Sequence, residues 1–210
     1  MLVLGVDPGL RNMGYCLMHD GMCVLVGLDD LYDGGEIVHA AIHGAMMRWL
    51  EGHSDLIAAA DVVLVEKQFV DGKKLALSAA LVVLMSVLQT VAHGKCRVVH
   101  ACTIKGAYRT RRGSHPENKK AAETLLFKLQ PDMAGCFSAG GHEGLVCVTN
   151  KGKGAAIEMH HVADAFLLCH WFFFKGNVHC TLALCYFLTV CVRRWARARS
   201  VERRGSRWRR

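Results

Sequence analysis

Val3-Leu4-Gly5-Val6-Asp7-Pro8-Gly9 is the stretch of sequence that decides the fold. The unbroken apolar run from Leu2 to Val6 predicts a strand that is buried on both faces. Asp7 ends this strand, and Pro8-Gly9 then turns the chain. In an open α/β sheet, ligand-binding residues gather at the carboxyl ends of the strands. Asp7 is therefore our first candidate for an active-site acid.

Hydrophobic periodicity places the other elements around this first strand. We expect strands at 13–19, 22–28, 61–65 and 97–100, and helices at 35–51, 73–93, 118–129 and 160–174. Residues 130–154 are rich in glycine and polar side chains, so we expect a long, mobile loop there. The resulting order, βββαβαβαα, predicts an RNase H-like α/β fold. Such a fold has a mixed five-stranded sheet flanked by helices, and its first three strands are antiparallel.

The positive charge of the chain is concentrated in two places. The formal net charge is +8, but nine of the 26 basic residues and only one of the 18 acidic residues lie between Arg193 and Arg210. The other 192 residues carry 17 of each and are neutral overall. Within them, one cluster is opposed by Glu117 alone: Lys105, Arg109, Arg111, Arg112, Lys119 and Lys120. Two basic patches on a neutral body favour a protein that grips a phosphate backbone.

The ten cysteines are scattered through apolar runs, without any Cys-x-x-Cys pair. No signal peptide is apparent, because the apolar run before Asp7 is too short for one. We therefore expect reduced, buried thiols, including Cys16, Cys96, Cys147 and Cys169, in an intracellular protein.

A second acid follows a second buried strand. Glu66 comes directly after the apolar run that ends at Val65. If the two strands are parallel neighbours, the carboxylates of Asp7 and Glu66 lie within a few ångströms of each other. Two such anions in a partly buried site repel each other unless a proton or a cation separates them. A divalent cation is the common solution.

The last predicted helix supplies further candidate ligands. His161 and Asp164 are three residues apart, so they project from one face of the helix. His160 and Asp164, four apart, also share a face, so spacing alone leaves open which histidine belongs to the site. Carboxylate-rich ligation suits Mg²⁺ or Mn²⁺. A pair of such ions about 4 Å apart would activate a water and stabilise the leaving 3′-oxygen of a phosphodiester.

Three motifs in this order resemble the Holliday junction resolvases of the RuvC type. They are Gly5 to Tyr15 with its Asp-Pro-Gly turn, Val63 to Gln68, and His161-Val162-Ala163-Asp164. The nearest branch is the one found in poxviruses, iridoviruses and mitochondria, and the resemblance covers about residues 1–172. Membership in a viral branch would place the protein in the cytoplasm or nucleus of an infected host cell.

The resemblance implies an activity and a set of site residues. The activity is paired nicking of four-way DNA junctions by a homodimer, and the long helix at 73–93 offers an apolar surface for that dimer. The implied catalytic and metal-binding residues are Asp7, Glu66, His161 and Asp164. The residues assigned to DNA binding are Gln68, Phe69, Lys73, Lys74, Lys105, Arg109, Arg111, Arg112, Lys119 and Lys120. His161 replaces an acid of many family members, and the tail has no counterpart in the family.

In this interpretation the chain has two regions, a nuclease domain at 1–175 and a separate C-terminal tail at 176–210. The apolar stretch 178–192 has fewer residues than the roughly 20 that span a bilayer, so we expect a core or interface element. A membrane anchor is the alternative, because arginine-rich flanks suit one. We expect the arginine-rich end to be disordered and to bind nucleic acid or anionic surfaces without sequence preference.

Two other functions compete with junction resolution. One is an RNase H-like nuclease that acts on RNA–DNA hybrids or flaps. The other is a non-catalytic nucleic-acid-binding protein. The second is opposed by the presence of all four site residues, because a degenerate relative would tend to have lost at least one.

Overall fold

A mixed sheet of seven strands forms the centre of the structure, in the order β5-β4-β1-β2-β3-β7-β6. The strands are β1 (Leu2–Asp7), β2 (Met13–His19), β3 (Met22–Asp29), β4 (Val62–Glu66), β5 (Cys96–Val99), β6 (Gly141–His142) and β7 (Leu145–Thr149). The first three pair antiparallel, whereas β4 joins β1 in parallel and β5 joins β4 in parallel. These five strands form the predicted mixed sheet in the RNase H-like order, so the predicted fold class is confirmed.

The computed structural model describes residues 1–31, 39–68, 75–110, 113–133, 141–142, 145–149 and 158–176. Met1–Phe173 forms one compact unit, and Phe174–Arg210 forms a second. Several predicted features lie outside the described residues, namely Phe69, Lys73, Lys74, Arg111, Arg112 and the apolar and arginine-rich parts of the tail. The predicted domain boundary at residue 175 stays a prediction.

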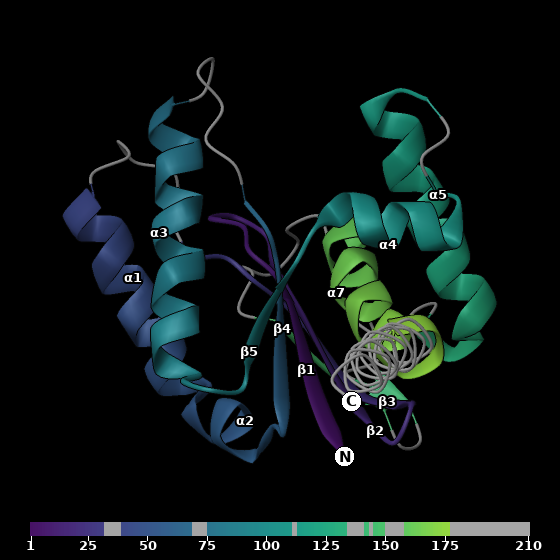
Figure 1. Ribbon diagram of the computed structural model, residues 1–210, viewed down its shortest axis with the longest axis horizontal. Helices are drawn as coiled ribbons and strands as arrows, with labels where there is room; N and C mark the ends of the chain where they lie inside the picture. Colours follow the sequence, from purple (N-terminus) through teal and green to yellow (C-terminus); the bar gives the residue numbers. More distant parts are fainter. Residues whose placement is uncertain are drawn as a thin grey trace, which may run out of the picture. The chain divides into compact units, whose positions relative to one another are not determined.

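Helices cover both faces of the sheet in the first unit. They are α1 (His39–Gly52), α2 (Ser54–Ala59), α3 (Leu75–Val91), α4 (Ala101–Tyr108), α5 (His115–Leu129) and α7 (Met159–Trp171), with short turns η2 (Pro131–Met133) and η3 (Phe172–Gly176). In Figure 1, α1 and α3 lie on one side of the sheet, and α4, α5 and α7 lie on the other. Of the described helices, none is long and apolar enough to cross a membrane.

The alternation of side chains along β1 joins the sheet to both helical layers. Val3 belongs to the buried cluster that includes Phe166 of α7 and Leu126 of α5. Leu4 and Val6 belong to the cluster on the other face, with residues of α1 and α3. Successive side chains of a strand point to opposite faces, so a strand with helices on both sides needs an unbroken apolar run.

The predicted loop at 130–154 was wrong in part. Its described residues include η2, β6 and β7, and β7 pairs in parallel with β3, extending the sheet from five strands to seven. The hydroxyl of Thr149 also donates a 2.7 Å hydrogen bond to the carbonyl oxygen of Leu28. The run Leu145 to Thr149 does read as a strand, but the glycine-rich sequence around it hid this signal.

Two helices in the middle of the chain differ from the prediction. Helix α4, which carries Lys105, was not predicted from the sequence. The next helix was predicted to begin at Asn118, whereas α5 begins at His115. The side chains of Ser114 and Glu117 form a capping box there, with Glu117 accepting a 2.7 Å hydrogen bond from the backbone N–H of Ser114. Lys119 consequently lies beyond the first turn of α5.

The expectation that the cysteines are reduced was wrong for Cys147, which is disulfide-bonded. The other described cysteines are free, as expected, namely Cys16, Cys23, Cys96, Cys102 and Cys169, but Cys96 is only half-buried and Cys102 is exposed. Cys147 lies in β7, the strand that the sequence analysis assigned to a loop.

A buried polar cluster joins the end of β3 to α1. The carboxylate of Asp29, which is 2% exposed, accepts a 3.0 Å hydrogen bond from Nε1 of Trp49 and lies 3.3 Å from Nε2 of His53. The imidazole of His53 stacks on Trp49 and lies 3.1 Å from the hydroxyl of Tyr15. Burial lowers the pKa of His53, but contacts with Asp29 and the carbonyl of Trp49 outweigh this effect and raise the pKa overall.

We predict a pH-dependent loss of stability in His53→Gln. Because folding raises the pKa of His53, its contacts stabilise the fold fully below the ordinary pKa near 6.5, and this contribution declines as the pH rises through the raised value. The variant should lose about 1–3 kcal/mol at acidic pH and less at alkaline pH. Urea unfolding at a series of pH values measures this difference. His43→Gln, at an exposed position of α1, is the control. A loss in His53→Gln that is constant with pH would contradict the prediction.

Candidate metal centre

Asp7 and Glu66 end two neighbouring parallel strands. The pairing of β1 with β4 runs from Val3↔Val62 to Val6↔Val65, and the two acids follow the last of these pairs directly. Asp7 is 7% exposed, and Glu66 is half-buried. The strand arrangement that the sequence predicted for these two acids is therefore present.

Two glycines let α7 pack unusually close to β1 and β2. A Cβ atom on Gly5 would lie 2.5 Å from the carbonyl oxygen of Ala165 and 2.7 Å from Sγ of Cys169. A Cβ atom on Gly14 would overlap the backbone carbonyl of His161. Gly14 pairs with Asp7 across the first hairpin. The first turn of α7 thus rests on the sheet beside the carboxylate of Asp7.

This close packing places His161, not His160, against Asp7. Nδ1 of His161 forms a 2.7 Å hydrogen bond with Oδ2 of Asp7. Asp164 lies three residues further along α7 and is half-buried. Its charge acts on Asp7, Glu66 and His161, which shows that the four predicted site residues lie in one electrostatic environment.

The carboxylates of this site are hard to ionise together. Burial raises the pKa of Asp7 well above its usual value, and the charge of Asp164 raises it further. Burial and the charges of Asp7 and Asp164 do the same for Glu66. Burial also raises the pKa of Asp164. Three acids that are destabilised in their charged forms would be stabilised by a nearby positive charge.

Two lysines offset part of this repulsion. Lys105 of α4 and Lys119 of α5 lower the pKa values of Asp7 and Asp164, although less than burial raises them. The pKa of His161 is lowered, first by burial and then by the charge of Lys119, while Asp164, Glu158 and Glu66 oppose this shift. Both lysines are predicted to bind DNA, and their positive charges lower the pKa values of Asp7 and Asp164.

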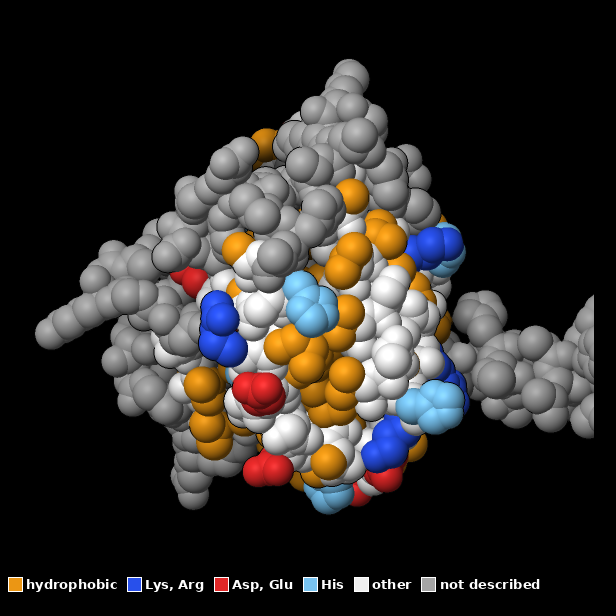
Figure 2. Space-filling view, turned by 90° about the vertical axis from the view of Figure 1, so that its left-hand side faces the viewer, with side chains coloured by type: hydrophobic (Ala, Val, Ile, Leu, Met, Phe, Trp, Pro, Cys, Tyr) orange, Lys and Arg blue, Asp and Glu red, His pale blue; other side chains and the backbone are white. Residues whose placement is uncertain are grey.

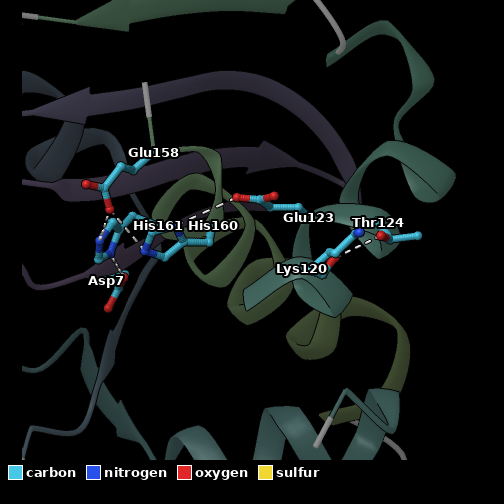
Figure 3. A network of polar contacts seen from close by, with 7 residues as sticks. All are labelled: Asp7, Lys120, Glu123, Thr124, Glu158, His160 and His161. Atoms are coloured by element: carbon cyan, nitrogen blue, oxygen red, sulfur yellow. Dashed lines mark hydrogen bonds and ion pairs between the residues drawn. The ribbon is translucent and has the colours of Figure 1, made fainter. Parts of the chain in front are cut away.

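His160 faces a different set of acids, which the sequence analysis did not identify. Its side chain is 9% exposed, with Nε2 3.4 Å from Oε2 of Glu158 and Nδ1 3.7 Å from Oε1 of Glu123. Nε2 of His161 lies 3.7 Å from the same oxygen of Glu158. Figure 3 shows both rings between Asp7, Glu158 and Glu123. Glu158 directly precedes Met159-His160-His161, and this Glu-x-His-His spacing is the sequence signal that could have identified Glu158 as a neighbour of the histidines.

The other described DNA-binding candidates occupy two regions. Gln68 is half-buried, and its side-chain amide donates a 3.4 Å hydrogen bond to the carbonyl oxygen of Glu66. Arg109 and Lys120 line a depression of about 650 Å³ between α4 and α5. Tyr108 lines this depression too, and its hydroxyl lies 2.5 Å from Nδ1 of His170.

The donor set fits a hard divalent cation at the carboxylates. Asp7, Glu66 and Asp164 supply oxygen atoms, as Mg²⁺ and Mn²⁺ prefer. Their raised pKa values indicate that a cation would relieve the repulsion among them. Within the described part of the chain, however, the three residues whose ligand atoms all lie within 4.8 Å of one another are Glu158, His160 and His161. The assignment of the four predicted ligands therefore stays a prediction.

Comparisons with solved structures find proteins of similar architecture at low identity. RuvC of Thermus thermophilus in complex with a Holliday junction substrate is 16% identical, with a TM-score of 0.49 over 84% of this chain and 96% of that chain. A second structure of RuvC from the same organism is 17% identical and has a TM-score of 0.45, and the match covers 84% of this chain and 96% of that chain. The yeast mitochondrial Holliday junction resolvase Ydc2 is 12% identical and has a TM-score of 0.44, and the match covers 89% of this chain and 83% of that chain. No model of a protein family matches the chain, and no curated protein matches it.

We predict that Gly14→Ala displaces α7 from the sheet. The new methyl group would overlap the carbonyl of His161, so the variant should lose about 1–3 kcal/mol of stability in denaturant unfolding. Gly106→Ala is the matched control, because a Cβ atom at Gly106 in α4 has no neighbour within 4 Å. This variant should gain up to about 1 kcal/mol. Equal effects of the two substitutions would show that α7 does not approach β2 as described.

We also predict that Glu66→Gln stabilises the metal-free protein at neutral pH. The substitution removes a half-buried carboxylate whose ionised form is disfavoured by burial and by the charges of Asp7 and Asp164, so the free energy of unfolding should rise by about 1 kcal/mol. Chemical denaturation in the presence of a chelator measures it. Glu51→Gln, at an exposed position of α1, should leave the stability unchanged. A destabilised Glu66→Gln would mean that the ionised carboxylate makes favourable contacts in the absence of metal.

Proposed function

We propose that the chain is a divalent-metal-dependent endonuclease that resolves four-way DNA junctions by paired nicks. The observation that carries this proposal is the buried Asp7, which is hydrogen-bonded to His161 and interacts electrostatically with the half-buried Glu66 and Asp164, on a sheet of RNase H-like strand order. The choice of four-way DNA junctions as the substrate rests on the resemblance of the sequence motifs to the RuvC-type resolvases. We also propose that the chain belongs to the branch of these enzymes that is found in poxviruses, iridoviruses and mitochondria.

Each residue of the group has a distinct part in this chemistry. Asp7, Glu66 and Asp164 would hold Mg²⁺ or Mn²⁺, which when bound supplies an activated water and stabilises the charge on the leaving oxygen. His161 is hydrogen-bonded to Asp7, so its imidazole can orient a water or complete the ligand set. The positive charges of Lys105 and Lys119 act on the same carboxylates and would attract the scissile phosphate.

The basic surface beyond the carboxylates would hold the arms of a branched substrate. Arg109 and Lys120 line the depression between α4 and α5, and Lys120 lies next to Lys119 on α5. Contacts of this kind bind phosphates without reading the sequence, as a structure-selective nuclease requires. This arrangement supports the assignment of these residues to DNA binding.

A homodimer would supply the second active site that paired nicking needs. Val83 and Val91 of α3 are 41% and 49% exposed, and Met47 of α1 is 37% exposed. Figure 2 shows hydrophobic side chains gathered on the α1 and α3 side of the molecule. An apolar face formed by a long helix suits a two-fold interface, so we include dimerisation through α3 in the proposal.

The test is cleavage of a synthetic four-way junction by the full chain with Mg²⁺ or Mn²⁺. We expect symmetric nicks, and slower cleavage of a linear duplex and of an RNA–DNA hybrid at the same salt concentration. Asp7→Asn should lower the rate by more than about 100-fold, because loss of a ligand should exceed the effect of losing a residue that merely orients one. Asp55→Asn, at an exposed position of α2, should cleave at the wild-type rate.

Three results would count against the proposal. Wild-type cleavage by Asp7→Asn would refute the site. Preference for the hybrid would favour an RNase H-like activity. Metal-independent binding without any product would favour the non-catalytic alternative. Repeating the assay with a chain that ends at Lys175 separates catalysis from the contribution of the tail.

A further inference from the structure

Two histidine rings at the start of α7 converge on one carboxylate. Nε2 of His160 and Nε2 of His161 lie 3.4 Å and 3.7 Å from the same Oε2 atom of Glu158. The two ring centroids are 4.0 Å apart. Ligand atoms of the three residues all lie within 4.8 Å of one another. Figure 3 shows Glu158 on one side of the pair of rings and Asp7 on another.

Each of these rings also has a second carboxylate near its other nitrogen, and for His161 this contact is a hydrogen bond. Nδ1 of His161 is hydrogen-bonded to Asp7, at 2.7 Å, and Nδ1 of His160 lies 3.7 Å from Oε1 of Glu123. A carboxylate that accepts the Nδ1 proton leaves the lone pair on Nε2, and it fixes the orientation of the ring. Histidines that bind metal ions are commonly held by a carboxylate in this way.

We propose that Glu158, His160 and His161 form a binding site for Zn²⁺ or a similar transition-metal ion, separate from the carboxylate centre of Asp7, Glu66 and Asp164. Two imidazoles and one carboxylate are a ligand set that Zn²⁺ accepts, with a fourth position left for water. Residue spacing alone leaves open which histidine belongs to the carboxylate centre. In this proposal both serve the second site, and His161 also contacts the first through Asp7.

The spacing of the ligand atoms suits a tetrahedral ion. Bonds of about 2.0–2.1 Å in tetrahedral geometry separate neighbouring ligand atoms by about 3.3 Å. The two distances to Oε2 of Glu158 exceed this value by only a few tenths of an ångström. Glu158 is 47% exposed at the edge of the site, so its carboxylate can move toward an ion without displacing the core.

The charges around the site favour a cation despite its position at a helix N-terminus, whose partial positive charge opposes one. Glu158 is a direct ligand, and Glu123 and Asp7 lie behind the two rings. Three carboxylates thus surround a site whose other ligands are neutral. Mg²⁺ prefers oxygen ligands, so this nitrogen-rich set selects a different ion from the one suited to Asp7, Glu66 and Asp164.

The experiment titrates Zn²⁺ into the chelator-treated full chain and follows binding by calorimetry. We expect Glu158→Gln to lower the affinity of one equivalent of Zn²⁺ by at least about 10-fold, and His160→Gln to do the same. The Glu158 side chain is half exposed, so this variant tests the site even if the buried His160→Gln does not fold. Glu51→Gln, an exposed Glu→Gln change on α1, should bind Zn²⁺ as the wild type does.

Co²⁺ identifies the ligands, because the chain also has free thiols. We subtract the Co²⁺ spectrum of Glu158→Gln from that of the wild type. The difference spectrum should show tetrahedral d–d bands without thiolate charge-transfer absorption. Equal affinity and stoichiometry of Zn²⁺ in wild type and Glu158→Gln would overturn the proposal, and so would a difference spectrum with no tetrahedral bands. The contacts would then be ion pairs alone. No nucleic acid is involved, so a failure of the proposed cleavage activity is a separate outcome.

Discussion

The site depends on the close approach of α7 to strands β1 and β2. Gly5 and Gly14 leave no side chain between the helix and the sheet, so backbone and side-chain atoms of α7 occupy that space. The helix therefore presents His161 at hydrogen-bond distance from an acid 154 residues earlier in the chain. Larger residues at these two positions would move the first turn of α7 outward. The glycines are thus part of the site although they provide none of its chemistry.

The same packing creates an electrostatic cost. Burial raises the pKa values of Asp7, Glu66 and Asp164, the charge of Asp164 raises those of Asp7 and Glu66 further, and the charge of Asp7 also raises that of Glu66. Lys105 of α4 and Lys119 of α5 offset only part of this effect, because they lower the pKa of Asp7 less than burial and Asp164 raise it. A structural ion pair would place each acid against its own base. Acids that outnumber their bases are instead typical of a site that binds a cation, at the expense of stability.

The sequence reveals the acids more readily than their surroundings. Asp7 and Glu66 could be identified because each follows an apolar run, and their parallel pairing follows from the strand order. The choice between His160 and His161 could not be made from spacing, since it depends on the rotation of α7, which the packing against Gly5 and Gly14 determines. The eight-residue helix α4 is too short for a clear period, and β7 was obscured by its glycine-rich neighbours. Glu123 joins the histidines only through the packing of α5 on α7, a contact without any local signal.

His161 lies between two groups of acids because its two ring nitrogens face different carboxylates. Nδ1 contacts Asp7 of the carboxylate centre, and Nε2 faces Glu158. A neutral imidazole has one N–H and one lone pair, so the two sides cannot be independent. When Nδ1 donates to Asp7, the lone pair is directed at Glu158, where a transition metal would strengthen that tautomer. Rotation or tautomerisation that gave the carboxylate centre the lone pair would withdraw it from Glu158. Occupation of the second site would therefore hold Asp7 in its hydrogen bond and compete with a role for His161 as a ligand at the first.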